Sequence, residues 1–196
     1  METEKQVIRR ELHAVLRGTS AEEREVWSSA VRDSLLAAAA WKSARTVMLF
    51  AALRYEPDLV PLLDLNTGKR LVFPVLEEDV IITREVKSPG DLAVSGHGIR
   101  EPERDHCPVV AAEEIDLVMV PGLGFGSDGS RLGRGKGHYE RLLAKLHATT
   151  LLCGVCFGCQ LSGSMPLEVH DIPMHALLTE NGWQDLSSPL RHPSAP

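Results

Sequence analysis

The sequence predicts an α/β fold: a single three-layer domain with a mostly parallel central sheet flanked by helices. Short apolar runs with strand character alternate along the chain with helical patterns, which is typical of such folds. A length of 196 residues is enough for one substantial core, and 43% apolar with 24% charged residues is ordinary for a globular protein. We expect residues 1–185 to form the domain and the Pro- and Ser-rich residues 186–196 to be a disordered tail.

The first half of the chain predicts two helices followed by strands. Residues 3–17 are charged with an apolar side, and Ser20 with Glu23 three positions later is a capping box for a helix running to about Ala40. The apolar runs that follow predict a buried strand, a short helix starting after Pro57 and two more strands, in residues 44–53, 56–66, 68–76 and 79–86.

The second half contains the clearest strand. Residues 87–114 are rich in Gly, Pro and charge and are expected to be irregular, whereas "IDLVMVPGLGF", residues 115–125, reads as a buried strand. A Gly-rich stretch follows, and a helix is expected from near Lys136 to about Ala148. The last strands are expected in residues 150–157 and 175–180.

Charge and hydropathy exclude several classes of protein. A net charge of −6 argues against a general binder of nucleic acid or anionic membrane. No apolar run approaches the roughly 18 residues of a transmembrane helix, and the charged N-terminus is unlike a signal peptide. We therefore expect a cytoplasmic monomer whose partners are small molecules, without nucleic acid or membrane.

Three of the four cysteines, Cys153, Cys156 and Cys159, have a spacing that resembles a metal site. On a strand, however, Cys153 and Cys159 would point to one face and Cys156 to the other, so the three could not share one ion. Because cysteine is also a common small buried residue, we expect reduced, structural thiols. A metal or redox module is the alternative, and metal analysis of the purified protein tests it.

The stretch "PGLGFGSDGSRLGRGKGHYERLL", residues 121–143, follows the clearest strand, where parallel sheets bind ligands. Consecutive backbone N–H groups in a Gly-rich turn form an anion-binding concavity, and a helix start near Lys136 would add its positive dipole end. Arg134 and Lys136 add positive charge. The pattern predicts a phosphate-binding loop, although it is neither a Walker loop nor G-x-G-x-x-G, which would need Gly in place of His138. A flexible surface loop is the alternative.

This stretch closely resembles the signature of the 5-formyltetrahydrofolate cyclo-ligase family, also called 5,10-methenyltetrahydrofolate synthetase. Four more segments resemble the family in the same order: the N-terminal helix, the substrate-binding Glu after the first strand, the Gly-Ile-x-Glu-Pro segment and the final His-Asp segment with its strand. In this chain they read "KQVIRREL", "YEPDLVPLL", "GIREP" and "PLEVHDIPMHALLTENG".

The resemblance implies an ATP- and Mg²⁺-dependent cyclisation of 5-formyltetrahydrofolate to 5,10-methenyltetrahydrofolate, with release of ADP and phosphate. ATP would phosphorylate the formyl oxygen, and N10 would then attack the activated carbon. The implied catalytic residues are Arg134, Lys136 and Tyr139. The implied ATP contacts are Lys5, Arg9, Gly133, Arg134, Gly135, Lys136, Gly137, His138 and Tyr139. The implied substrate contacts are Glu56, Gly137, His138 and Tyr139, and the implied Mg²⁺ ligands are Glu140 and Asp171.

The chain departs from the family pattern near the implied site. His138 stands where Tyr is usual, Glu140 where Asp is usual and Gly126 where Asp is common, and residues 57–59 differ as well. His170 is interpreted as supporting Asp171 rather than as a zinc ligand. Two alternatives remain: a non-catalytic folate- or nucleotide-binding relative, and a family member that acts on a different substrate.

Overall fold

The computed structural model describes residues 2–95, 98–168 and 171–186, and it confirms the predicted α/β fold. Seven strands form the central sheet, in the spatial order β12 (Gly182–Asp185), β11 (Ala176–Thr179), β9 (Leu151–Val155), β6 (Leu117–Pro121), β1 (Thr46–Met48), β2 (Arg70–Glu77) and β3 (Val80–Glu85). The strands from β11 to β2 are parallel, and the edge strands β12 and β3 pair antiparallel. The predicted tail lies outside the described residues except for Leu186, and so does His170.

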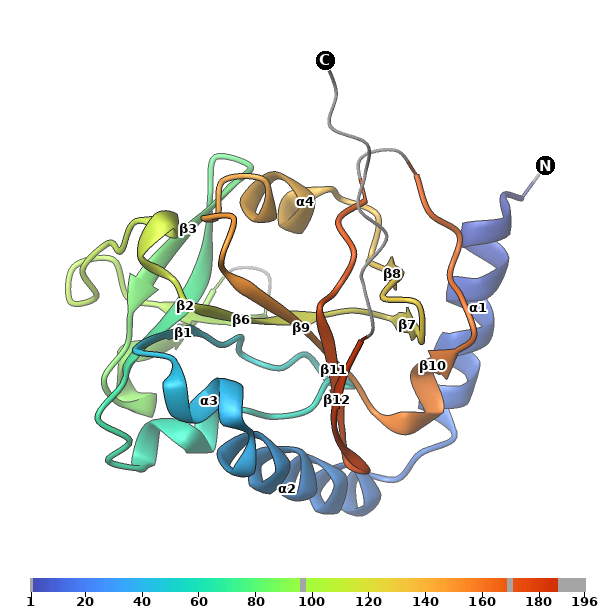
Figure 1. The fold of residues 1–196 in the computed structure, drawn as a ribbon, viewed down its shortest axis with the longest axis horizontal. Helices are drawn as coiled ribbons and strands as arrows, with labels where there is room; N and C mark the ends of the chain where they lie inside the picture. The colour runs from blue at the N-terminus through green and yellow to red at the C-terminus, as the bar shows by residue number, and fades with distance from the viewer. Residues whose placement is uncertain (1, 96–97, 169–170, 187–196) are drawn as a thin grey trace.

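Helices cover both faces of this sheet (Figure 1). On one face, α2 (Ala21–Ala37) and α3 (Ala39–Ser43) bury Val31, Leu35 and Trp41 in a core with the inward side chains of the strands. On the other face, α4 (His138–Leu143) buries Leu142 and Leu143 in a second core. The sheet is therefore the middle of three layers, as the sequence predicts.

A small second sheet stands beside α1 (Glu4–Arg17) and supports the Gly-rich loop (Figure 1). Its strands are β10 (Leu161–Ser162), β7 (Gly124–Gly126) and β8 (Arg131–Leu132). A Cβ on Gly124 would lie 2.7 Å from Leu12 of α1 and 2.6 Å from Met165, so a larger residue would require these two side chains to shift. Because β8 ends at Leu132, the Gly-rich loop begins directly at its end.

Several elements differ from the sequence prediction. The predicted long second helix is interrupted at Ala38, whose extended backbone separates α2 from α3 and lets Trp41 reach the core. The helix predicted to reach Ala148 ends at Leu143, where the N–H groups of Lys145 and Leu146 donate to the carbonyls of Leu142 and Leu143 in turns instead of continuing the α-helical pattern. The segment predicted to be irregular, residues 87–114, contains two short strands and two 3₁₀ turns: β4 (Leu92–Val94), β5 (Arg100–Pro102), η2 (Pro89–Asp91) and η3 (Ala112–Glu114). Two further 3₁₀ turns lie outside this segment, η1 (Val60–Asp64) and η4 (Gly158–Gln160).

The cysteine run is divided between the two cores. Cys153 packs in one core and Cys156 in the other, as strand alternation predicts. Cys159 differs from the prediction, because β9 ends at Val155 and places Cys159 in η4, exposed. Burial raises the pKa of Cys153 and of Cys156, which keeps both thiols protonated. Among residues 2–95, 98–168 and 171–186, no three His, Cys, Asp or Glu side chains form a group that could hold a metal ion.

The part of the chain that the structure describes contains no helix of the length and apolar character that crossing a membrane requires.

Candidate active site

A cavity of about 270 Å³ opens where β1, β2 and β6 end. Apolar side chains line part of it, and the Gly-rich loop and Glu56 line another part. The apolar lining residues include Phe50, Leu53, Pro74, Leu76, Ile81 and Ile99, and those of the loop and its neighbours are Gly133, Arg134, Gly135, Lys136, Gly137, His138, Tyr139 and Glu140. The carboxyl ends of parallel strands are the expected place for a ligand. The cavity thus joins a surface suited to planar rings with a surface suited to anions.

The Gly-rich loop connects β8 to α4 and lines this cavity with glycines, which have no side chain to cover their backbone. Gly135 and Gly137 have φ angles of +90° and +68°, a conformation that side chains disfavour. In the described chain, the backbone N–H groups of residues 134–137 donate to no protein acceptor. Because α4 has only six residues, its dipole is smaller than the sequence prediction assumed, and the loop N–H groups and nearby cations would supply most of the attraction for an anion.

Two cations of α1 reach the region from the N-terminal end of the chain. Arg9 Nε donates to the carbonyl oxygen of Gly133 at 3.0 Å and so holds the start of the loop. Lys5 Nζ lies 2.9 Å from both Glu168 Oε1 and Asp171 Oδ2. Burial opposes protonation of Lys5, but the hydrogen bonds to Asp171 and Glu168 outweigh it and raise the pKa. The Lys5 and Arg9 side chains therefore link α1 to two different parts of the predicted site.

Glu56 lies buried at the cavity and is paired with the Gly-rich loop. Its Oε1 accepts a hydrogen bond from Arg134 Nη2 at 2.8 Å, and its Oε2 accepts one from the Leu53 N–H at 3.0 Å. The Glu56 side chain is 6% exposed and that of Arg134 is 40% exposed, so the carboxylate of this ion pair is buried and the guanidinium is partly in solvent.

Arg131 is a site residue that the sequence prediction missed. Its Nη1 donates to Glu140 Oε1 at 2.7 Å, its Nε donates to the Pro121 carbonyl at 2.9 Å, and its guanidinium lies 5.2 Å from the centre of the Tyr139 ring. Burial, with the nearby charge of Glu56, raises the pKa of Tyr139, so the phenol stays protonated and can donate a hydrogen bond. Arg131 thus fixes two neighbouring residues at the start of α4.

The turn between β2 and β3 is held against α4. His138 Nε2 lies 2.7 Å from Asp79 Oδ1, and Arg141 Nη2 donates to the Asp79 carbonyl at 2.7 Å. The hydrogen bond from His138 lowers the pKa of Asp79. Asp79 is a second residue that the sequence prediction missed, because its turn looks like any charged surface turn.

Lys136 differs from the other cations of the site. It lines the cavity and is exposed, and among the described residues its Nζ has no hydrogen-bond or ion-pair partner. Its positive charge is therefore available to a bound anion.

The structure brings most of the predicted site residues together. Glu56 and the loop from Gly133 to Glu140 line one cavity, and Arg9 contacts the loop. Lys5, Arg9 and Asp171 lie outside the residues that line it. The two predicted Mg²⁺ ligands are each held by a cation, Glu140 by Arg131 and Asp171 by Lys5.

Comparison with known proteins identifies the relatives of the chain. The profile of the 5-formyltetrahydrofolate cyclo-ligase family matches residues 1–180. The 5-formyltetrahydrofolate cyclo-ligase of Mycolicibacterium smegmatis is 32% identical over 87% of both chains, and that of Escherichia coli is 32% identical over 69% of this chain and 78% of its own.

Solved structures agree with this relationship. The NMR structure of Aquifex aeolicus 5,10-methenyltetrahydrofolate synthetase covers 98% of both chains at 32% identity, with a TM-score of 0.84. A 5,10-methenyltetrahydrofolate synthetase from Mycoplasma pneumoniae, at 18% identity and a TM-score of 0.72, covers 91% of this chain and 99% of its own and shares the fold.

Proposed function

The chain belongs to the 5-formyltetrahydrofolate cyclo-ligase family and is an enzyme of that activity, and we propose that its cavity binds ATP and 5-formyltetrahydrofolate side by side. One observation supports this most: loop N–H groups without a protein acceptor in the described chain, Lys136 and a set of apolar side chains line a single cavity. Such a cavity suits phosphates at one side and a pteridine at the other. The buried Glu56 carboxylate suits the amino and ring N–H donors of a pterin.

The proposed reaction proceeds in two steps. The formyl oxygen takes the γ-phosphoryl group of ATP and ADP leaves, which turns a poor leaving group into a good one. The N10 nitrogen then attacks the formyl carbon, loses its proton to solvent and expels phosphate as the methenyl bridge closes. Because phosphoryl transfer depends on alignment and charge neutralisation, Lys136, Arg134 and the loop N–H groups would act mainly by binding and orienting the phosphates.

Glu140, which lines the cavity, and Asp171, which Lys5 of α1 contacts, are the acids that would hold a hard divalent cation. Glu140 and Asp171 provide carboxylate oxygens, which are the ligands that Mg²⁺ prefers, and Mg²⁺ usually takes only one or two carboxylates beside nucleotide phosphates. When bound, Mg²⁺ would supply further neutralisation of phosphate charge. Arg131 and Lys5 hold these carboxylates at 2.7 and 2.9 Å, so the acids are oriented before any ligand arrives.

We expect formation of 5,10-methenyltetrahydrofolate, followed by its absorbance, to require 5-formyltetrahydrofolate, ATP and Mg²⁺ together. ADP should appear in equal amount and only when the folate is present. Binding of both ligands without product would instead indicate a non-catalytic relative. ATP hydrolysis at the same rate with and without the folate would indicate that the enzyme acts on a different substrate.

We expect Asp171→Asn to raise the Mg²⁺ concentration for half-maximal activity by at least about 10-fold, because asparagine keeps the shape but loses the charge of a proposed ligand. Glu168→Gln is the matched control, since Glu168 contacts the same Lys5 Nζ at the same 2.9 Å but is no proposed ligand. Activity measured over a range of Mg²⁺ concentrations gives the half-maximal concentration for both variants. An equal shift in the two would assign the effect to Lys5 and remove Asp171 from the metal site.

A further inference from the structure

The hairpin formed by β2 and β3 supplies part of the active-site cavity and ends close to α4 (Figure 1). Pro74, Leu76 and Ile81 of this hairpin line the cavity, and Leu76 is paired with Ile81 across the two strands. The Gly-rich loop and His138, at the start of α4, line the same cavity. The spacing between the hairpin and the loop therefore depends on the contacts that join the end of the hairpin to α4.

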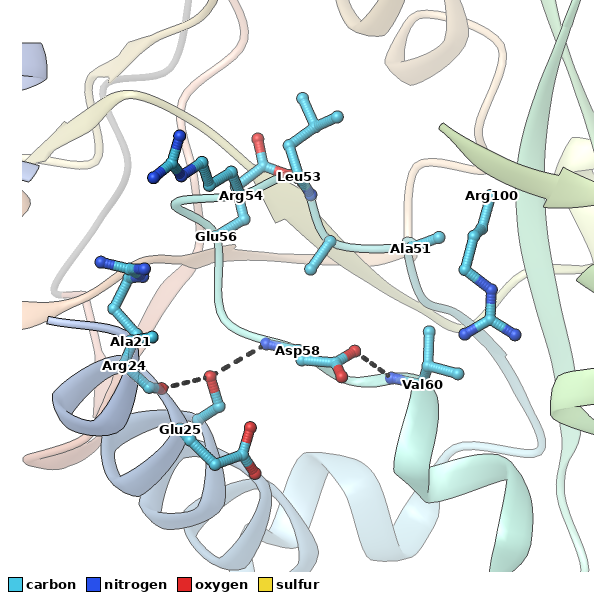
Figure 2. Close-up of a pocket in the computed structure, with 12 residues that line it drawn as sticks. Ala21, Arg24, Glu25, Ala51, Leu53, Arg54, Glu56, Asp58, Val60 and Arg100 are labelled. Atoms are coloured by element: carbon cyan, nitrogen blue, oxygen red, sulfur yellow. Dashed lines mark hydrogen bonds between the residues drawn. The ribbon is translucent and has the colours of Figure 1, made fainter. Parts of the chain in front are cut away.

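A second cavity, of about 280 Å³, adjoins the active-site cavity and lies between the start of α2 and the segment after β1, as Figure 2 shows. The two cavities share four lining residues, Ala51, Leu53, Glu56 and Arg100. No described residue of the hairpin or of the Gly-rich loop lines the second cavity. The contacts between the hairpin and α4 thus border the active-site cavity and not the adjoining one.

The turn at the end of the hairpin has a strained backbone. The two strands pair as far as Glu77 and Val80, so Glu78 and Asp79 are the central residues of a two-residue turn. Both have positive φ angles, +45° and +69°, as a type I′ turn requires. Asn-Gly and Asp-Gly are the preferred pairs in such turns, so glycine is the residue that the backbone favours at position 79.

Asp79 makes two side-chain contacts that glycine could not make. Its Oδ1 lies 2.7 Å from His138 Nε2, and its Oδ2 accepts a hydrogen bond from Arg141 Nη2 at 3.0 Å. The carboxylate of Glu78 differs, because it is exposed and has no hydrogen-bond or ion-pair partner among the described residues. The strained turn therefore holds one carboxylate against α4 and leaves its neighbour in solvent.

The contact with Asp79 orients the imidazole ring of His138. A carboxylate accepts hydrogen bonds, so Nε2 is the ring nitrogen that donates to Asp79. In the described chain Nδ1 has no hydrogen-bond partner and is available to a ligand. The His138 side chain is 17% exposed and that of Asp79 is 76% exposed, so a largely buried ring is held by a partner that lies in solvent.

We propose that Asp79 is a positioning residue that holds His138 in the orientation that binds the folate. The proposal rests on the proposed function, in which the apolar lining of the cavity receives the pteridine. A planar imidazole that lines the same cavity can stack on such a ring. Backbone strain persists mainly where function requires it, and here the strained turn places the carboxylate that orients His138.

The test compares Asp79→Gly with the wild type in steady-state kinetics and thermal unfolding. KM for 5-formyltetrahydrofolate should rise about 3- to 10-fold, the range for losing a charge-assisted hydrogen bond that is partly exposed to solvent. KM for ATP and kcat should stay unchanged, because Lys136 and the loop N–H groups are the proposed phosphate contacts. The melting temperature should not fall, because glycine relieves the turn while only exposed contacts are lost.

The matched control is Glu78→Gly, which relieves the other residue with a positive φ angle in the same turn but removes no side-chain contact with α4. It should leave KM for the folate unchanged. The same rise in Glu78→Gly as in Asp79→Gly would assign the effect to a more flexible turn and overturn the proposal. A lower melting temperature in Asp79→Gly with an unchanged KM would assign Asp79 to stability alone, which also overturns it.

A second comparison tests whether Asp79 acts through His138. His138→Phe keeps a planar ring but cannot donate to Asp79, so in that background Asp79→Gly should cause no further rise in KM for the folate. An equal rise in both backgrounds would overturn the proposal. Absence of methenyl product from the wild type would instead count against the proposed function, so the two failures are distinguishable.

Discussion

Replacing Lys136 by alanine is expected to lower kcat/KM for ATP by about 100-fold or more, the loss seen when one preorganised stabilising group is removed from a reacting centre. Lys136 lines the cavity beside the loop N–H groups of residues 134–137, and no described residue neutralises its charge by an ion pair. The folded protein gains little from such a lysine, so the free energy of unfolding should change by less than about 0.5 kcal/mol.

The matched control is Lys145→Ala. Lys145 is exposed, follows α4 and does not line either cavity, so its loss removes the same charge from the same region without touching the loop. Steady-state kinetics in ATP and urea denaturation of both variants give the comparison. Full activity in Lys136→Ala, or a loss that Lys145→Ala reproduces, would show that another group neutralises the phosphates.

The sequence is sufficient to predict the elements that depend on local pattern. The apolar run around β6 and the capping box at Ser20 both appear in the structure, where Ser20 Oγ accepts a hydrogen bond from the Glu23 N–H at 3.1 Å. The small second sheet could not be predicted in this way. Its strands are two or three residues long, and β7 pairs with β10, more than thirty positions later, so it has no periodicity to detect.

The same division holds for the site. A Gly-rich loop after a buried strand can be placed at one edge of the sheet from topology, and the family resemblance adds Glu56, which does reach Arg134 across 78 positions. The contacts of Arg131 with Glu140 and of Asp79 with His138 depend on how a hairpin and a short strand approach α4. Sequence spacing contains no information on that approach. The joining of Lys5 to Asp171 likewise follows from packing.

Glu56→Gln is expected to raise KM for 5-formyltetrahydrofolate by about 10- to 100-fold, the range for losing one hydrogen bond to a charged group. Glutamine keeps the size of the side chain and can still accept the Leu53 N–H bond, but it offers a donor where the pterin also has donors. KM for ATP should not rise, because losing the Glu56 charge frees Arg134 from its ion pair at 2.8 Å and leaves that cation to the phosphates.

Glu56→Gln should raise KM for the folate but not for ATP, whereas Lys136→Ala should lower kcat/KM for ATP. The two variants therefore separate the proposed roles of Glu56 and Lys136. Glu25→Gln is the control for a lost acid, since Glu25 is also paired with an arginine but is 69% exposed and lines only the adjoining cavity. It should leave both KM values unchanged. If Glu56→Gln raised KM for ATP and for the folate by the same factor, Glu56 would act by positioning Arg134, and the pterin would have to find its acceptor elsewhere on the cavity wall.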